Sequence, residues 1–257
     1  MNIDSIGTSN TINILIGLII VFCFIVMHFI EIASFGSRVA GRVINRVALG
    51  TTLQVSIMTL SRFFLVPFLP LLAFLVESGI IIEDYLVLVI ASYLMSFVAS
   101  IIILFKLDFF QSFFQKIFIN YDNHTILKAF LVTVFNSRKN IKLIHFKTFS
   151  LKRIIVKKVI VSCIAYLFLI TGFFISFMLA ILYPENRLTL TQFTATFHGF
   201  GAIIVAIYLD PMLSRSIDLS ENETTWIANV YSIILGRVLS YFLVLTGMTC
   251  FLVIKIF

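Results

Sequence analysis

Two arginines interrupt the long apolar runs of this 257-residue chain, and their positions indicate a site for an anion. Arg62 lies about halfway along one run, and Arg237 lies about a third to halfway along another. A charged side chain at the centre of a bilayer costs about 2.5–3.5 kcal/mol, so each arginine needs a partner or a function there. A guanidinium meets two phosphate oxygens at once and keeps its charge. The sequence therefore predicts an anionic, lipid-like substrate.

A stripe of ionisable residues lies on one face of the first apolar run. His28, Glu31 and Arg38 follow one another at i, i+3 and i+10, and a helix that turns about 100° per residue places them on a shared face. Glu31 is the acid most clearly available to neutralise the deep arginines, and it lies nearer the inner surface. An anionic substrate would supply the missing charge. The alternative is that these groups pair with one another and hold the helices together.

Other polar side chains lie near these residues in the second and fifth runs. The candidate substrate-binding residues are His28, Glu31, Arg38, Gln54, Arg62, Gln192, His198, Asp210 and Arg237. His28 with Glu31 resembles half of a metal site, but no second ligand pair of the H-E-x-x-H kind exists in the sequence, so we predict no metal and no cofactor.

Transmembrane helices must position these residues. The chain is 60% hydrophobic and 12% charged, and its mean hydropathy is +1.10. About 20 apolar residues cross a bilayer as a helix, whereas a β-barrel needs alternating segments of about ten. We predict an all-α integral membrane protein with a single polytopic domain, 1–257, and six spans at 11–34, 47–76, 86–105, 154–183, 191–212 and 226–254.

The distribution of Lys and Arg predicts the orientation. Arg38, Arg42 and Arg46 follow the first span, whereas acidic residues without Lys or Arg follow the second. Both termini should lie outside, and the basic connection 106–153 should lie inside. Phenylalanines at helical spacing between 109 and 118 predict an amphipathic helix on the inner leaflet. The net charge of +7 thus serves orientation and contact with membrane lipids, and we predict no nucleic-acid partner.

The division into three spans plus three predicts an inverted repeat, because an odd number of spans reverses the direction of entry. The middle spans of both halves are interrupted. Pro67 and Pro70 lie in the second span, and Gly199 and Gly201 lie in the fifth, which ends at Asp210-Pro211. Corresponding broken helices often mark a substrate site.

The residues of the ionisable stripe also carry a family resemblance. The segment HFIEIASFGSRVAG at 28–41 resembles the signature of the Amj family of bacterial lipid II flippases. The segments at 60–62, 192–199 and 236–239 and the Asp210-Pro211 pair agree with it in the same order. The chain departs from the family pattern at Gln54 and His198, where the family has Asn.

The resemblance implies a six-span protein of the bacterial cytoplasmic membrane that carries undecaprenyl-diphosphate-linked lipid II from the inner to the outer leaflet. The sequence has no phosphate loop and no G-x-S-x-G elbow, so we predict a transporter and not an enzyme. Three alternatives remain open: an exporter of another polyprenyl-linked or anionic lipid, a membrane scaffold for cell-wall enzymes, and a lipid phosphatase or transferase. Six helices are few for a bulky head group, which favours a homodimer or a lipid-facing groove.

Overall fold

The computed structural model describes residues 3–135, 154–219 and 223–256, and within them every element is helical. The order is α1 (Ile3–Ala33), α2 (Phe35–Val43), α3 (Val47–Ser61), η1 (Arg62–Phe64), α4 (Leu65–Glu77), α5 (Ile82–Phe105), α6 (Leu107–Tyr121), α7 (Ile126–Phe135), α8 (Val156–Leu182), η3 (Pro184–Asn186), α9 (Arg187–Ile204), η4 (Val205–Leu209), α10 (Asp210–Leu219) and α11 (Glu223–Ile256).

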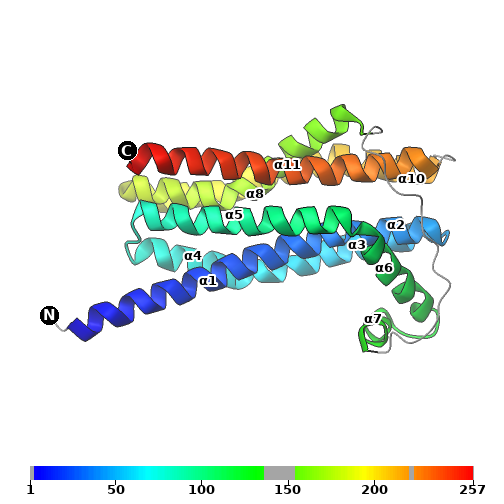
Figure 1. The fold of residues 1–257 in the computed structure, drawn as a ribbon, viewed down its shortest axis with the longest axis horizontal. Coiled ribbons are helices and arrows are strands. Elements are labelled where there is room, and N and C mark those ends of the chain that lie inside the picture. The colour runs from blue at the N-terminus through cyan, green and yellow to red at the C-terminus, as the bar shows by residue number, and fades with distance from the viewer. Residues whose placement is uncertain (1–2, 136–153, 220–222, 257) are drawn as a thin grey trace.

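Six stretches of the described chain are long and apolar enough to cross a membrane, which confirms the predicted number of spans and the all-α class. They are Ile12–Val43, Val47–Glu77, Ile82–Phe105, Val156–Leu182, Pro184–Leu219 and Thr225–Lys255. The third span begins at Ile82 and the fifth at Pro184, earlier than the predicted starts at 86 and 191. The helices run side by side along the long axis of the bundle, and α5 packs against both α1 and α11 (Figure 1).

Aromatic side chains fill the centre of the bundle. Phe24 of α1 contacts Phe68, Tyr93 and Phe174 from three other helices, with ring centroids 5.0–5.9 Å apart. The hydroxyl of Tyr93 donates to the carbonyl of Ile170 at 2.8 Å, so its polar end is satisfied inside the core. This centre fixes α1, α4, α5 and α8 relative to one another.

The second and fifth spans both leave regular α-helical geometry one turn before a proline. The 3-10 turn η1 precedes Pro67, and the π-helical segment η4 precedes Pro211. A proline ring clashes with the carbonyl four residues earlier, and its nitrogen donates no hydrogen bond. The affected carbonyl is that of Phe63 for Pro67 and that of Ile207 for Pro211. Gly199 and Gly201 lie within regular α9, so our attribution of the second interruption to them was wrong.

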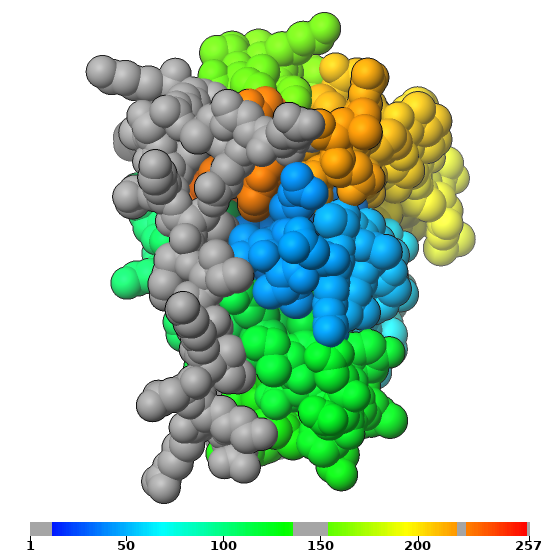
Figure 2. Space-filling view, turned by 90° about the vertical axis from the view of Figure 1, so that its right-hand side faces the viewer, coloured from blue at the N-terminus to red at the C-terminus, as the bar shows by residue number. Residues whose placement is uncertain are grey.

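The helices α6 and α7 of the basic connection lie at the end of the bundle where α2 and α10 also lie (Figure 1). Figure 2 views this end and shows α2 between the α6–α7 pair and the region of α10. Phe114, Ile117 and Phe118 of the predicted amphipathic stripe are buried with Ala40 of α2, so part of that stripe packs within the protein. The inverted repeat and the contact of this stripe with the inner leaflet stay predictions, as does the single-domain boundary.

An exposed ion pair fastens α6 to the turn between α2 and α3. Arg46 Nη2 donates to Asp122 Oδ2 at 3.0 Å. This hydrogen bond lowers the pKa of the Asp122 carboxyl and raises that of Arg46. Because the pKa of Asp122 is lower in the folded protein, the contact stabilises the fold above the ordinary carboxyl range and loses its effect as the pH falls through the lowered value.

Gly236 permits the closest approach between α11 and α8. A Cβ at this position would lie 2.5 Å from the carbonyl oxygen of Val159 and 2.6 Å from Cβ of Ser162. These atoms belong to the backbone and to a buried side chain, so neither can move away without shifting a helix. Small residues allow such approaches between membrane helices.

We therefore expect Gly236→Ala to destabilise the protein by about 1–3 kcal/mol, as overpacking does, and to lower its midpoint of thermal unfolding in detergent. Gly247→Ala is the matched control in the same helix, because nothing lies within 4 Å of a Cβ there. That variant should be neutral or more stable by about 0.5–1 kcal/mol. Equal midpoints for the two variants would contradict the close contact.

Candidate functional site

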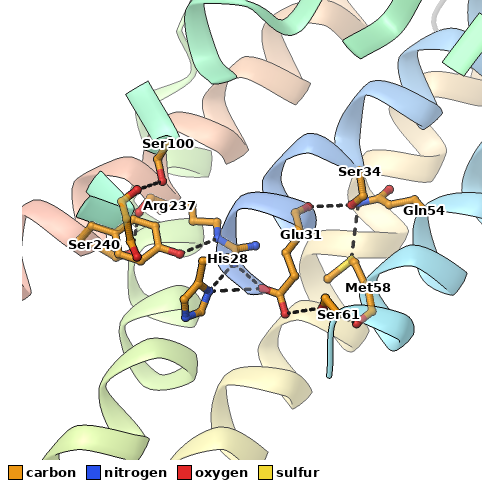
Figure 3. A network of polar contacts seen from close by, with 11 residues as sticks. His28, Glu31, Ser34, Gln54, Met58, Ser61, Ser100, Arg237 and Ser240 are labelled. Atoms are coloured by element: carbon orange, nitrogen blue, oxygen red, sulfur yellow. Dashed lines mark hydrogen bonds and ion pairs between the residues drawn. The ribbon is translucent and has the colours of Figure 1, made fainter. Parts of the chain in front are cut away.

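A buried ion pair joins the first and last spans at the centre of the membrane-crossing region. Arg237 Nη2 of α11 donates to Glu31 Oε2 of α1, and the Arg237 side chain is 1% exposed. The same nitrogen lies 2.9 Å from Nδ1 of His28. A guanidinium can only donate, so Nδ1 of His28 accepts and the ring proton lies on Nε2. Figure 3 shows Glu31 pointing toward both His28 and Arg237.

Two tyrosines and a serine complete the surroundings of this pair. The guanidinium carbon of Arg237 lies 4.5 Å from the centre of the Tyr166 ring, a cation–π contact from α8. Arg237 Nε donates to the Tyr241 hydroxyl at 3.3 Å. On the other side, Ser61 Oγ lies 3.3 Å from Glu31 Oε1. Four spans thus hold one charge pair, and the Glu31 side chain keeps 17% of its surface exposed.

A second ion pair closes the end of the bundle near α2 and α10. Arg38 Nη2 donates to Asp210 Oδ1 at 2.8 Å. The Arg38 side chain is 2% exposed, whereas that of Asp210 is 40% exposed. Nε and Nη1 of Arg38 are buried and make no hydrogen bond to any described residue. This pair joins the first span to the fifth, and two buried nitrogens of Arg38 keep no acceptor in the described residues.

Arg62 differs from the other two arginines, because it makes no hydrogen bond or ion pair with any residue that the structure describes. It begins η1, midway along the second span, and its side chain is exposed. It lines an open groove of about 650 Å³. His198 of α9 lies within electrostatic range of both Arg62 and Glu31.

Neither of the two glutamines makes a hydrogen bond with these charged groups in the described residues, although Gln54 lies in the same polar network as Glu31 (Figure 3). Gln54 is buried, and its amide nitrogen lies 3.7 Å from the sulfur of Met58. Gln192 is exposed on α9, about 9 Å along the helix from His198. The structure thus brings together His28, Glu31 and Arg237, places Arg62 and His198 nearby, and pairs Arg38 with Asp210.

Sequence reasoning missed the two tyrosines that enclose Arg237. Tyr241 follows Arg237 at i+4, a spacing at which side chains meet on a helix, so a signal for it was present. Nothing in the sequence pointed to Tyr166, which comes from another span. Within the described ranges, no three His, Cys, Asp or Glu side chains gather in a way that could hold a metal ion.

Comparison with known protein families gives one match that covers most of the chain. The family model Amj, described as "Alternate to MurJ", matches residues 23–249. The chain belongs to the Amj family. This confirms the resemblance seen in the sequence, and every candidate residue from His28 to Arg237 falls inside the part of the chain that matches Amj. No curated protein and no solved structure matches the chain.

Proposed function

We propose that this member of the Amj family moves lipid II, the undecaprenyl-diphosphate-linked peptidoglycan precursor, from the inner to the outer leaflet of the bacterial cytoplasmic membrane. The observation that carries the proposal is the Amj match over residues 23–249, whose description names an alternate to MurJ. The protein would act as a transporter and not as an enzyme. In this proposal both termini lie outside, as the Lys and Arg distribution predicts.

The charges in the membrane-crossing region support an anionic substrate. Of Arg38, Arg62 and Arg237, only Arg62 is without an ion pair in the described residues. Its guanidinium can bind a diphosphate without breaking an existing contact. Arg38 keeps two buried donors without partners at the inner end of the proposed path. In this proposal the diphosphate meets Arg38 first and Arg62 next, while Glu31 and Arg237 hold the helices between them.

The exposure of α9 supports a path that is open to lipid. Within α9 only Gly201 is fully buried, and the helix packs chiefly against α8. A groove at the protein–lipid boundary lets the prenyl chain stay in the bilayer while the sugar and peptide cross beside the protein. An inside-negative membrane potential favours outward movement of negative charge by about 2.3 kcal/mol per charge per 100 mV, so net transport does not require ATP.

The proposed function is tested by depleting a bacterium of its own lipid II flippase while it expresses this protein. We expect the parent protein to sustain growth and Arg62→Gln to fail at equal abundance in the membrane, because Gln has no charge to offer the diphosphate. Arg215→Gln is the matched control, since Arg215 is exposed near the inner end of the fifth span. Failure of the parent protein, present at normal abundance, would contradict the proposal.

A further inference from the structure

The guanidinium of Arg62 lies where an uncompensated charge is least tolerated. Arg62 is midway between Val47 and Glu77, with about 22 Å of helix on either side. Its side chain is exposed, whereas neighbouring Ser61 is fully buried against Glu31. An arginine at this depth that meets only hydrocarbon is strongly unfavourable. A negatively charged group beside Arg62 would offset this cost.

The surface around Arg62 is a groove with an apolar wall. It is lined by Val55, Ser56, Thr59, Leu60, Arg62, Phe63 and Val66. The side chains of Leu60 and Phe63 are 72% and 67% exposed. The hydroxyl of Thr59 already donates to the carbonyl of Val55 at 2.9 Å, which leaves Ser56 as the other polar donor. The groove thus offers one positive charge beside a run of aliphatic and aromatic surface about 16 Å long.

A second copy of the chain cannot readily supply the missing negative charge. Within the described residues, the acids that lie inside the spans away from their ends are Glu31 and Asp210. Glu31 is paired with Arg237, and Asp210 is paired with Arg38. A carboxylate from a partner would have to leave one of these pairs and expose an arginine in turn. The remaining source at this depth is a negatively charged group carried by a membrane lipid.

We propose that this groove binds the phosphate group of an isoprenoid membrane lipid, with Arg62 as the phosphate contact and the lipid chain along Leu60, Phe63 and Val66. The inference deepens the proposed function, on which it rests for the isoprenoid character of the chain. The groove has one charge and two hydroxyls, which is too few polar groups to recognise a disaccharide or a peptide. It therefore recognises phosphate and chain, and the undecorated carrier phosphate is a ligand as well as lipid II.

The test measures binding of undecaprenyl phosphate to the purified full-length protein by native mass spectrometry. We expect Arg62→Gln to weaken binding at least tenfold and Phe63→Ala to weaken it several-fold, whereas Arg215→Gln should bind as the parent does. The Arg62→Gln variant should keep its thermal stability, because Arg62 makes no contact that the fold needs. Equal binding by the parent and Arg62→Gln would overturn the proposal.

Two further arms separate the possible ligands. Inorganic phosphate at millimolar concentration should leave the bound lipid in place, and displacement by it would overturn the role of the chain. A cysteine at Leu60 should form no disulfide-linked dimer in membranes, and an efficient one would show that a second copy covers the groove. The growth assay is independent of these results. Binding of undecaprenyl phosphate without rescue of growth would contradict the proposed function and leave this binding site standing. Rescue of growth without binding would contradict the binding site and leave the proposed function standing.

Discussion

Replacing Glu31 with Gln is expected to destabilise the folded protein by about 3–5 kcal/mol, because it leaves Arg237 buried without a counter-ion. Arg237 is held by Glu31, His28, Tyr166 and Tyr241, and the three that would remain carry no negative charge to replace the carboxylate. The effect should appear as a large fall in the midpoint of thermal unfolding in detergent and as reduced abundance in the membrane.

The double variant Glu31→Gln with Arg237→Met distinguishes a charge effect from a loss of packing. Removing both charges from a buried pair is often neutral, so the double variant should regain most of the stability that the single variant loses. It should still transport poorly if the pair also positions Ser61 and the adjacent Arg62. A single Glu31→Gln variant as stable as the parent would show that Arg237 has another counter-ion.

The second large effect concerns the pair between Arg38 and Asp210, whose partners differ in exposure. Asp210→Asn leaves a guanidinium that is 2% exposed without its counter-ion, so we expect a loss on the order of 3 kcal/mol. Arg38→Gln leaves a carboxylate that is 40% exposed, so its cost in stability should be the smaller of the two.

The measurement compares the losses of stability of these two variants by thermal unfolding in the same detergent, and we expect the larger loss for Asp210→Asn. Equal losses would mean that Asp210 is as enclosed as Arg38 in the membrane. If Arg38 contacts the substrate as proposed, transport should show the opposite sensitivity: Arg38→Gln would remain folded and still lose at least tenfold in the delivery of lipid II to the outer leaflet.

The spans could be predicted from the sequence because each is a long and predominantly apolar run, and the cost of exposing a backbone to lipid leaves helices as the solution. The ionisable stripe on the first span could also be predicted, because the spacing of residues along one helix alone decides which side chains share a face. The ion-pair partners of Glu31 and Arg38 could not be predicted from the sequence. Glu31 and Arg237 are 206 residues apart, and Arg38 and Asp210 are 172 apart, so their pairing depends on which spans pack together.

The interruption of the fifth span shows how a local cue can mislead. Two glycines near its middle suggested a break, yet both lie in regular α9, where Gly201 allows a close approach to Ala165. The disturbance comes from Pro211, whose effect falls on the preceding turn. The aromatic stripe of α6 was recognised correctly as one helical face, but the sequence could not show that α2 covers part of it.

The π-helical segment η4 also sets the rotational phase of the part of the fifth span that precedes it, α9. A π-helical turn contains about one residue more than an α-helical turn, so α9 is rotated by about 100° relative to an unbroken α-helix that continued from α10. His198 lies on the far side of that extra residue from Asp210. Deleting a single residue between Val205 and Leu209 would therefore absorb the extra residue and leave His198 on its present face, whereas converting this segment to an α-helix at constant length would turn His198 by about a quarter of a revolution.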